Sequence, residues 1–254
     1  MGRLHLFEIE DQAWCPAVLR DAGTAYLDRF TERFGLLKGA SQQIRAVVAA
    51  SPEHRVVDLG SGAGGPARLL LELVDDDVQV VCTDLFPNPS ALDHSQALAP
   101  EGRFSWRKEP VDARDVPADL LGARTLFNAF HHLRADDARA VLADAVAKGQ
   151  PIGVFEFVGR QPHAIPGMMG VPFAVLAMVP FLRPFRWAWI PLTYLVPVIP
   201  LFVFWDGLVS CLRVYSPAEL RELVQGLDAF DWDIGTFPLP FPGHGTYLVG
   251  TPRA

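Results

Sequence analysis

The chain has 254 residues, of which 50% are hydrophobic and 20% charged, and its formal net charge is −7. This composition fits one large domain, or one domain with an insertion, and excludes an intrinsically disordered chain. The acidic balance also argues against nucleic-acid binding, because phosphate contacts require Lys and Arg. The three cysteines are too scattered for a disulfide framework or a zinc cluster, so we expect a reducing compartment and no metal.

The N-terminal segment carries Glu8, Glu10 and Asp11, which interrupt any apolar core of signal-peptide length. We therefore expect a cytoplasmic protein. Residues 12–50 place apolar side chains three and four positions apart and predict helices that are broken by glycines. This pattern indicates an N-terminal helical cap over residues 1–54.

From residue 55 onward, short apolar runs bounded by turns alternate with helical stretches. Such alternation predicts an α/β fold, a parallel sheet with helices on both faces. Near the end of the chain, a Pro/Gly-rich loop joins two alternating strands, which we expect to add antiparallel strands to the sheet edge. The predicted strands cover residues 55–59, 78–83, 104–106, 124–128, 152–158, 231–237 and 245–251, and the predicted helices cover 66–74, 90–98, 136–148 and 217–227.

The connection after the fifth strand, residues 160–213, is much longer than the roughly 2–6 residues usual in such folds. It separates the core at 55–159 from a C-terminal part, 214–254, that completes that core. It contains two stretches of 19 uncharged residues, and four Arg against one Asp give it a net charge of +3. Prolines interrupt both stretches, and a two-pass hairpin would place its central arginines against the positive-inside tendency, so spans are not expected.

Three interpretations of this insertion remain. It forms broken helices that roof an apolar substrate pocket, or it lies on the inner face of the membrane, with Trp187, Trp189 and Trp205 near the head groups and the arginines on anionic lipid. The third interpretation is a second hydrophobic core or a homodimer interface. The first two are compatible, because a lipophilic substrate would be collected from the membrane itself.

The run VVDLGSGAGG at the end of the first strand fits two patterns. Gly60, Gly62 and Gly65 match the dinucleotide fingerprint, with Asp84 as the ribose ligand, whereas counting from Asp58 gives D-x-G-x-G-x-G. A carboxylate at Asp58 would repel a pyrophosphate but attract the ammonium and sulfonium groups of S-adenosylmethionine. The sequence therefore favours S-adenosylmethionine, with a nucleotide-dependent oxidoreductase as the alternative. A turn without a ligand is disfavoured, because four glycines cost chain entropy.

This run and the later VVCTDLF, VDARDVP and NAFHHL resemble the class I S-adenosylmethionine-dependent methyltransferases, including bacterial members with an apolar insertion. The resemblance spans residues 55–158 and 214–251. It implies a Rossmann-like sheet of seven strands with the last one antiparallel, and S-adenosylhomocysteine as the product. It also implies that Asp84 holds the ribose hydroxyls and Asp112 the adenine amino group. The implied cofactor residues are Asp58, Gly60, Ser61, Gly62, Gly64, Asp84, Leu85, Asp112, Ala113 and Asn128.

There are three candidate catalytic residues: two follow the fourth predicted strand, and one lies in the fifth. His131 and His132 are placed where ligands bind in such folds, and the pKa of imidazole suits a base at neutral pH. A hydroxyl acceptor needs such a base, whereas a carboxylate acceptor does not. The alternative is that the histidines only form a turn. Glu156, inside an apolar strand, either has a structural partner or faces the active site.

Four further residues are predicted to contact the substrate. Trp14 and Tyr26 would cover the cofactor, although packing alone would also explain both. Arg213 with Tyr215 would meet an acidic group of the substrate, or would only anchor the insertion to the domain. The expected activity is methyl transfer to an oxygen of a small hydrophobic or lipid-like acceptor. A membrane-associated protein that binds the cofactor without turnover is the alternative outside the enzymes.

Overall fold

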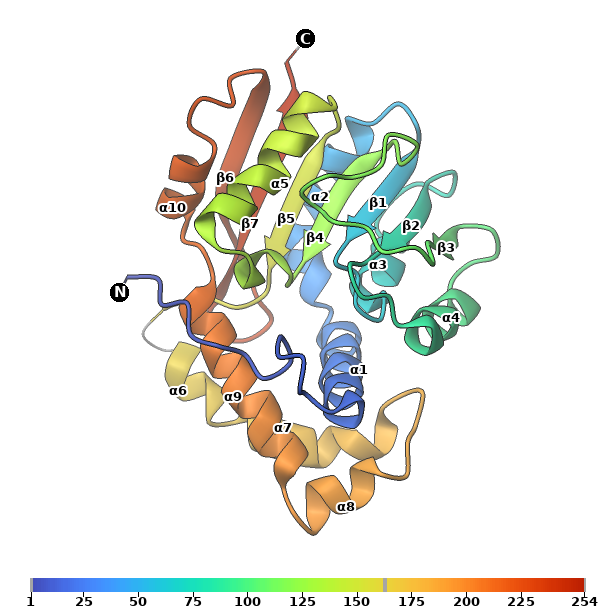
Figure 1. Ribbon diagram of the computed structural model, residues 1–254, viewed down its shortest axis with the longest axis vertical. Coiled ribbons are helices and arrows are strands. Elements are labelled where there is room, and N and C mark those ends of the chain that lie inside the picture. Colours follow the sequence, from blue (N-terminus) through green and yellow to red (C-terminus); the bar gives the residue numbers. More distant parts are fainter. Residues whose placement is uncertain (1, 162–163, 254) are drawn as a thin grey trace.

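The computed structural model describes residues 2–161 and 164–253, and its centre is one seven-stranded sheet (Figure 1). The strand order is β3-β2-β1-β4-β5-β7-β6, so the first strand lies inside the sheet. The strands are β1 (Arg55–Leu59), β2 (Gln79–Thr83), β3 (Phe104–Trp106), β4 (Ala123–Phe127), β5 (Ile152–Glu156), β6 (Phe230–Pro238) and β7 (His244–Pro252). All seven predicted strands are therefore present, with ends shifted by at most two residues.

The C-terminal strand pair determines the edge of the sheet. β7 runs antiparallel to both β5 and β6, with Phe155 opposite Tyr247 and Ile234 opposite Leu248. Only β7 is therefore reversed, and β6 points the same way as β1 to β5. The prediction of seven strands with the last one antiparallel is confirmed, and β7 enters between β5 and β6.

Helices cover both faces of the sheet, as the alternation of strands and helices predicts. Alternate strand residues serve opposite faces: Val56 packs in one core and Val57 in the other, as the two-residue period of a strand requires. The first face holds η1 (Leu36–Ala40), α2 (Ser41–Ala49) and α3 (Gly65–Leu70); the second holds α5 (Ala135–Ala147) and α10 (Pro217–Leu223); α4 (Pro89–Leu98) packs beside β3.

The N-terminal segment lies against the insertion and the sheet. Its main helix is α1 (Ala17–Phe34), which ends at Gly35 in the left-handed conformation, φ 60°. This ending explains the break that the sequence pattern predicts there, because glycine adopts positive φ at little cost. Before α1, the extended chain runs along α9, and the Leu4 amide donates to the Leu212 carbonyl at 3.0 Å.

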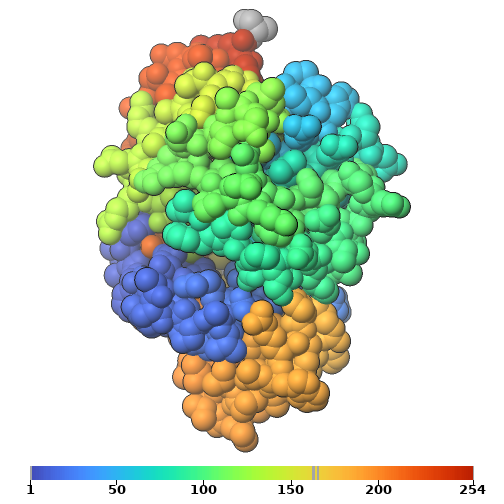
Figure 2. Space-filling model, turned by 45° about the vertical axis from the view of Figure 1, so that its right-hand side comes forward, coloured from blue at the N-terminus to red at the C-terminus, as the bar shows by residue number. Residues whose placement is uncertain are grey.

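The insertion folds as short helices followed by one longer helix. They are α6 (Ala164–Met168), α7 (Val171–Met178), η3 (Val179–Phe181), α8 (Trp189–Tyr194) and α9 (Val198–Arg213). Pro172 and Pro180 are the second residues of α7 and η3, within the first turn, where a missing amide costs little. The insertion packs with α1 in a third hydrophobic cluster that includes Tyr26, Trp189 and Phe202. Figure 2 shows it projecting at one end of the molecule.

Within residues 2–161 and 164–253, no helix alone is long and apolar enough to cross a membrane. The pair α9 and α10 meets the length and composition of a span only together, and it is bent by 63°.

Candidate functional site

The glycine loop between β1 and α3 has the backbone geometry that only glycine adopts readily. Gly60, Gly62 and Gly64 have φ of 65°, 55° and 78°. A Cβ on Gly64 would lie 3.0 Å from the Phe104 ring and 3.2 Å from Leu92, so this position is also crowded. The loop therefore needs glycine both for its conformation and for its packing.

Two backbone amides of the glycine loop donate hydrogen bonds to carboxyl groups of this chain, those of Asp84 and Asp28. Gly62 N–H donates to Asp84 Oδ2 at 2.9 Å, and Phe86 N–H donates to the other oxygen, Oδ1, at 2.8 Å. A Cβ on Gly65 would collide with the Asp28 carboxyl, which α1 brings to the start of α3. Burial raises the pKa of Asp28 to about 7, opposed by Arg68 and by the Gly65 amide. The loop thus faces two carboxyl groups at the place where a dinucleotide would need its pyrophosphate.

Asp58 does not have the position that the sequence argument assigned to it. It is 2% exposed, and its Oδ1 accepts a hydrogen bond from the Thr125 hydroxyl on β4 at 2.6 Å. Burial raises its pKa to about 7, against the hydrogen bonds from Thr125 and Ser61. Asp58 therefore points into the sheet and joins β1 to β4. The carboxyl groups that meet the loop amides are instead those of Asp84 and Asp28.

The remaining adenosine-side candidates lie at the surface beside the loop. Leu85 is 42% and Phe86 84% exposed, and two such apolar side chains after β2 suit a purine ring. Asp112 is bound by Arg114, which also pairs with Asp137, and these hydrogen bonds hold the pKa of Asp112 below its usual value. Ala113 is partly buried next to Asp112. Asp112 would share its carboxylate between Arg114 and an adenine amino group.

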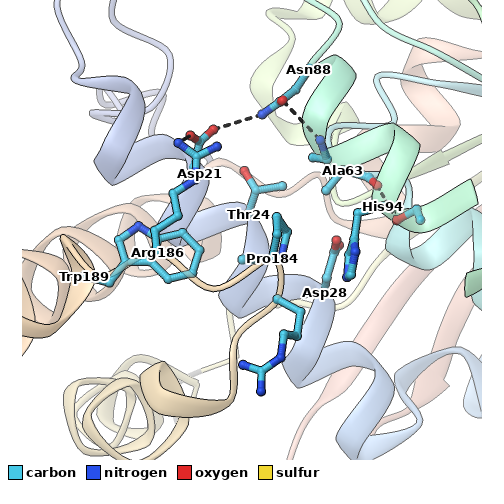
Figure 3. A pocket seen from close by; sticks show the side chains of 13 residues that line it. Asp21, Thr24, Asp28, Ala63, Asn88, His94, Pro184, Arg186 and Trp189 are labelled. Carbon is cyan, nitrogen blue, oxygen red and sulfur yellow. Dashed lines mark hydrogen bonds and ion pairs between the residues drawn. The ribbon is translucent and has the colours of Figure 1, made fainter. Parts of the chain in front are cut away.

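A small hollow near the loop holds the insertion in place rather than a ligand. Figure 3 shows Asp21 of α1 between Arg186 and Asn88, at 2.8 Å and 2.9 Å respectively. The hollow measures about 30 Å³, which is room for about one water molecule. These polar contacts fix the insertion to α1 and to the segment after β2.

A much larger cavity of about 540 Å³ lies at the carboxyl ends of β4 and β5. Its wall comes from α1, α6, α7, α9, the residues after β4 and β5, and the loop between β6 and β7. Most of the wall is apolar, including Phe30, Val171 and Phe202, and the volume falls in the range of pockets for small organic molecules. Of the predicted cofactor residues, Asn128 lines this cavity, so the glycine loop and the cavity meet at the end of β4.

Asn128 has the strained backbone that this junction requires. Its φ is 49°, which is uncommon outside glycine, and its Oδ1 accepts from the Phe157 amide at 2.7 Å. Its own amide donates to the Phe155 carbonyl at 3.0 Å. These two bonds tie the end of β4 to the end of β5 and turn the chain toward His131 and His132.

One end of the cavity is polar, and His131 is held there by Glu156. The two Glu156 oxygens contact His131 twice: Oε1 accepts from the backbone amide at 3.0 Å and Oε2 lies 2.6 Å from Nδ1. Both side chains are buried. A carboxylate at Nδ1 favours the tautomer with the proton on that atom, which leaves a lone pair on Nε2.

His132 lies among three carboxyl groups of the N-terminal segment. Its Nδ1 is 2.8 Å from Asp11 Oδ1 and 3.0 Å from Glu8 Oε2, and its Nε2 is 3.7 Å from Glu10 Oε1. Burial alone would lower the pKa of His132, but these carboxylates outweigh it and raise the pKa to about 10. Glu8, His131 and Glu156 are buried, whereas Glu10, Asp11 and His132 are partly exposed. We call the set Glu8, Glu10, Asp11, His131, His132 and Glu156 the histidine cluster.

Arg213 and Asp206 of α9 complete the surroundings of this cluster. Arg213 Nη1 lies 2.6 Å from Asp11 Oδ2 and 3.1 Å from Glu8 Oε2. Asp206 accepts the amides of Ile9 and Glu10 at 2.7 and 3.0 Å, and burial raises its pKa to about 6. Burial likewise raises the pKa of Glu10 to about 7, against the charge of His132. The N-terminal segment is thereby fixed to α9 over the mouth of the cavity.

The predicted substrate residues separate into one on the cavity and three away from it. Tyr26 lines the cavity, and burial raises the pKa of its hydroxyl. Trp14 is 65% exposed and lies outside the lining. Arg213 is occupied by carboxylates of this chain, and Tyr215 donates to the Leu133 carbonyl at 2.8 Å. Both therefore anchor the segments around the cavity, as the anchoring alternative states.

Four neighbours of the histidines were not predicted from the sequence: Glu8, Glu10, Asp11 and Asp206. The first three served there only to exclude a signal peptide. A run of acidic residues before the first helix is unusual next to apolar residues, but its partners lie more than 100 positions away. No local spacing signals such a contact.

Comparisons with solved structures identify the fold. No family model and no curated protein matches the chain. An O-methyltransferase family protein from Burkholderia thailandensis superposes with a TM-score of 0.55 and 16% identity, covering 92% of this chain and 60% of its own. The O-methyltransferase NcsB1 from neocarzinostatin biosynthesis, bound to S-adenosyl-L-homocysteine and 1,4-dihydroxy-2-naphthoic acid, gives 0.54 and 19%, covering 91% and 57%. The fold is that of the class I methyltransferases.

These likenesses establish the fold and not the activity. A protein from Rhodobacter sphaeroides described as a Zn-dependent alcohol dehydrogenase also superposes, with a TM-score of 0.51 and 13% identity over 92% of this chain and 98% of its own. The chain spans only 57–60% of the length of the two methyltransferases. At such identities the fold is shared, and activity has to be argued from the site.

Proposed function

We propose that this protein transfers the methyl group of S-adenosylmethionine to an oxygen atom of a small apolar acceptor held in the cavity. The observation that carries the proposal is the glycine loop, whose amides meet the carboxyl groups of Asp84 and Asp28. The Gly62 and Gly65 amides already donate to these carboxyl groups and are not free to hold a dinucleotide pyrophosphate, whereas S-adenosylmethionine is phosphate-free and carries two cationic groups. The neighbouring structures named above, with S-adenosylhomocysteine in NcsB1, support the same cofactor.

The residues around the loop fit this cofactor. The glycines bring the backbone close, Asp84 presents a carboxylate to the ribose hydroxyls, and Leu85 and Phe86 offer an apolar surface to the adenine. Asn128 stands where the loop meets the cavity. When bound, S-adenosylmethionine supplies an electrophilic methyl group on its sulfonium.

The cavity would position the acceptor and exclude water. Its apolar wall suits a hydrophobic molecule, and its polar end presents His131 and His132 to the acceptor oxygen. Glu156 fixes the ring of His131, so Nε2 keeps its lone pair and a hydroxyl acceptor can be deprotonated as it is methylated. An acceptor carboxylate would need positioning only.

The test is S-adenosylhomocysteine formation with labelled S-adenosylmethionine and a panel of apolar phenols, naphthols and carboxylic acids, together with calorimetry of both cofactor types. We expect S-adenosylmethionine to bind and one acceptor class to be labelled. Glu156→Gln should reduce kcat by about 10–100-fold and leave cofactor affinity unchanged, and Glu101→Gln at the surface serves as the control. Binding of nicotinamide dinucleotides in place of S-adenosylmethionine would make the protein an oxidoreductase. Cofactor binding without turnover would make it a binding protein.

We also propose that the insertion touches the inner membrane surface, where it would collect a lipophilic acceptor. Phe173, Phe181, Trp187 and Leu195 are 72%, 62%, 82% and 80% exposed, and the segment has a net positive charge. Trp189 cannot take part, because it is 1% exposed and its Nε1 donates to the Val18 carbonyl. This proposal keeps the protein cytoplasmic and peripheral.

Flotation with anionic phosphatidylglycerol vesicles tests the membrane contact. The wild-type protein should float, and the double variant Phe181→Ser with Trp187→Ser should not. Leu98→Ser, which removes an apolar side chain of α4 that is 57% exposed, should float like the wild type. A protein that stays in the aqueous fraction and sediments as a dimer that the double variant disrupts would assign the same patch to a homodimer interface.

A further inference from the structure

The histidine cluster contains three donor atoms arranged as ligands of one ion. Glu8 Oε1 lies 3.7 Å from His131 Nε2, and Glu8 Oε2 lies 3.0 Å from His132 Nδ1. The carboxylate oxygen and the two ring nitrogens all fall within 4.8 Å of one another. Ligand atoms about 2.0–2.2 Å from a Zn²⁺ ion are separated by about 3.0–3.6 Å. The three side chains therefore need little movement to share an ion, and His132 Nδ1 would exchange its 2.8 Å contact with Asp11 Oδ1 for the ion.

The second observation is the buried nitrogen of His131. Its Nε2 has no hydrogen-bond partner among the described residues, although the side chain is almost completely buried. Because Glu156 takes Nδ1, the lone pair of Nε2 faces the carboxylate of Glu8. Two electron-rich atoms in this arrangement are stabilised by a cation between them. A carboxylate that holds the outer nitrogen of a histidine while the inner one binds metal is the usual second shell of such a ligand.

The charges around the three donors point the same way. Five carboxyl groups gather here, from the histidine cluster and from Asp206. Two fixed cations stand against them: Arg213, which pairs with Asp11 and Glu8, and Arg3, which donates to the His131 carbonyl at 3.1 Å. Arg213 is nearest to Asp11, which leaves Glu8 to be shared. The excess of negative groups in a buried place requires further positive charge, supplied by protons or by an ion.

We propose that Glu8, His131 and His132 form a binding site for a divalent transition-metal ion of the Zn²⁺ type. Two imidazoles and one carboxylate suit Zn²⁺, and also Mn²⁺ and Fe²⁺, better than they suit Mg²⁺ or Ca²⁺. Three protein ligands leave coordination positions open. Both histidines line the cavity, so an open position lies beside it.

The site would determine which acceptors are used, a step that rests on the proposed methyl transfer. An ion at this place would bind the acceptor hydroxyl and lower its pKa, so that the ion rather than a free Nε2 activates the oxygen. It would also tie residues 8–11 to the segment after β4. The cavity then favours apolar molecules that carry a hydroxyl or a pair of adjacent oxygens at one end.

The test measures metal binding without S-adenosylmethionine, so that it stands apart from the methyl-transfer assay. Chelator-treated full-length protein is titrated with Zn²⁺ by calorimetry and with Co²⁺ by visible absorption. We expect one ion per chain, Co²⁺ bands of a site with nitrogen ligands, and a higher melting temperature with Zn²⁺. His132→Gln and Glu8→Gln should each weaken binding by about 100-fold or more.

His54→Gln is the matched control, because His54 is a surface histidine that pairs with Asp77 far from the cavity. It should bind Zn²⁺ like the wild type. Circular dichroism checks that each variant is folded, and a variant that fails to fold is replaced by His131→Asn or His132→Asn. The proposal is overturned if folded wild-type protein shows no saturable binding of Zn²⁺, Co²⁺ or Mn²⁺, or if folded His132→Gln binds as tightly as wild type. Protons alone would then neutralise the cluster.

Discussion

The glycine loop draws most of its contacts from residues 58–86, on two adjacent strands, whereas the histidine cluster combines residues 8–11, 131–132 and 156 with side chains of α9. The loop is therefore a local structure whose glycines carry a recognisable spacing. The cluster is assembled from the two ends of the chain and its middle. The comparison teaches that the cofactor side of this fold is encoded locally, while the acceptor side depends on how the N-terminal segment and the insertion dock.

The largest effect should come from Arg213, because it connects α9 to the N-terminal segment. Arg213→Met leaves the buried carboxylate of Glu8 and the partly exposed carboxylate of Asp11 without this cation and should lower the free energy of unfolding by about 3–5 kcal/mol. Urea denaturation measures it. Arg253→Met, which breaks an exposed pair with Asp231, should cost less than about 0.5 kcal/mol. Equal losses in the two variants would contradict a role of the cluster in docking the insertion.

The next prediction concerns Asp58, at the glycine loop, and the dependence of the protein's stability on pH. Its pKa is raised from the usual 3.8 to about 7, so the folded state holds a proton that the unfolded state releases. This contribution is complete below pH 3.8 and is lost as the pH rises through 7, by about 2–4 kcal/mol. Asp58→Asn keeps an acceptor for Thr125 and removes this loss. The difference between the melting temperatures at pH 5 and pH 8.5 should therefore be smaller in the variant than in the wild type, and Asp28, Glu10 and Asp206 account for the part that remains. Asp76→Asn at the surface should follow the wild type.

Asp84 is expected to matter for binding more than for stability. Asp84→Asn keeps one acceptor for the loop but loses the charge and the second acceptor, and a hydrogen bond to a charged group contributes about 2 kcal/mol. The affinity for S-adenosylmethionine should therefore fall by about 30-fold, as calorimetry would measure. Asp76→Asn again provides the control. An unchanged affinity would remove Asp84 from the cofactor site.

The smallest expected effect is on the free energy of unfolding when Gly64 of the loop is replaced by alanine. Comparison with Gly102 separates the cost of the backbone conformation from the cost of crowding. Gly64 and Gly102 have similar φ values, 78° and 74°, but a Cβ at Gly102 would meet nothing within 4 Å. Both alanine variants carry the left-handed strain, and only Gly64→Ala also pushes against Phe104 and Leu92. Its unfolding free energy should be lower than that of Gly102→Ala by about 1 kcal/mol. Similar values for the two variants would mean that the packing gives way at no cost.

The elements of the sheet were readable because each depends on its own periodicity. Val56 and Val57 alternate between two cores, Gly35 ends a helix, and β7 was expected antiparallel from the resemblance of the whole pattern. The orientation of Asp58 was not readable, since a strand residue faces a neighbour that the sequence does not reveal. The prediction that Trp189 lies near the lipid head groups was wrong for the same reason. Its side chain is buried against α1 instead of facing solvent.

The sequence by itself determined the α/β sheet, the glycine loop with its positive φ angles, and the length and apolar character of the insertion. These properties follow from local conformational preferences and from the two-residue and 3.6-residue periods of hydrophobic side chains. Tertiary structure alone decided that Asp28 of α1 meets the loop at Gly65, and that Glu8, Glu10 and Asp11 surround the two histidines. Those contacts join residues far apart in the chain, and their positions depend on the packing of every element between them.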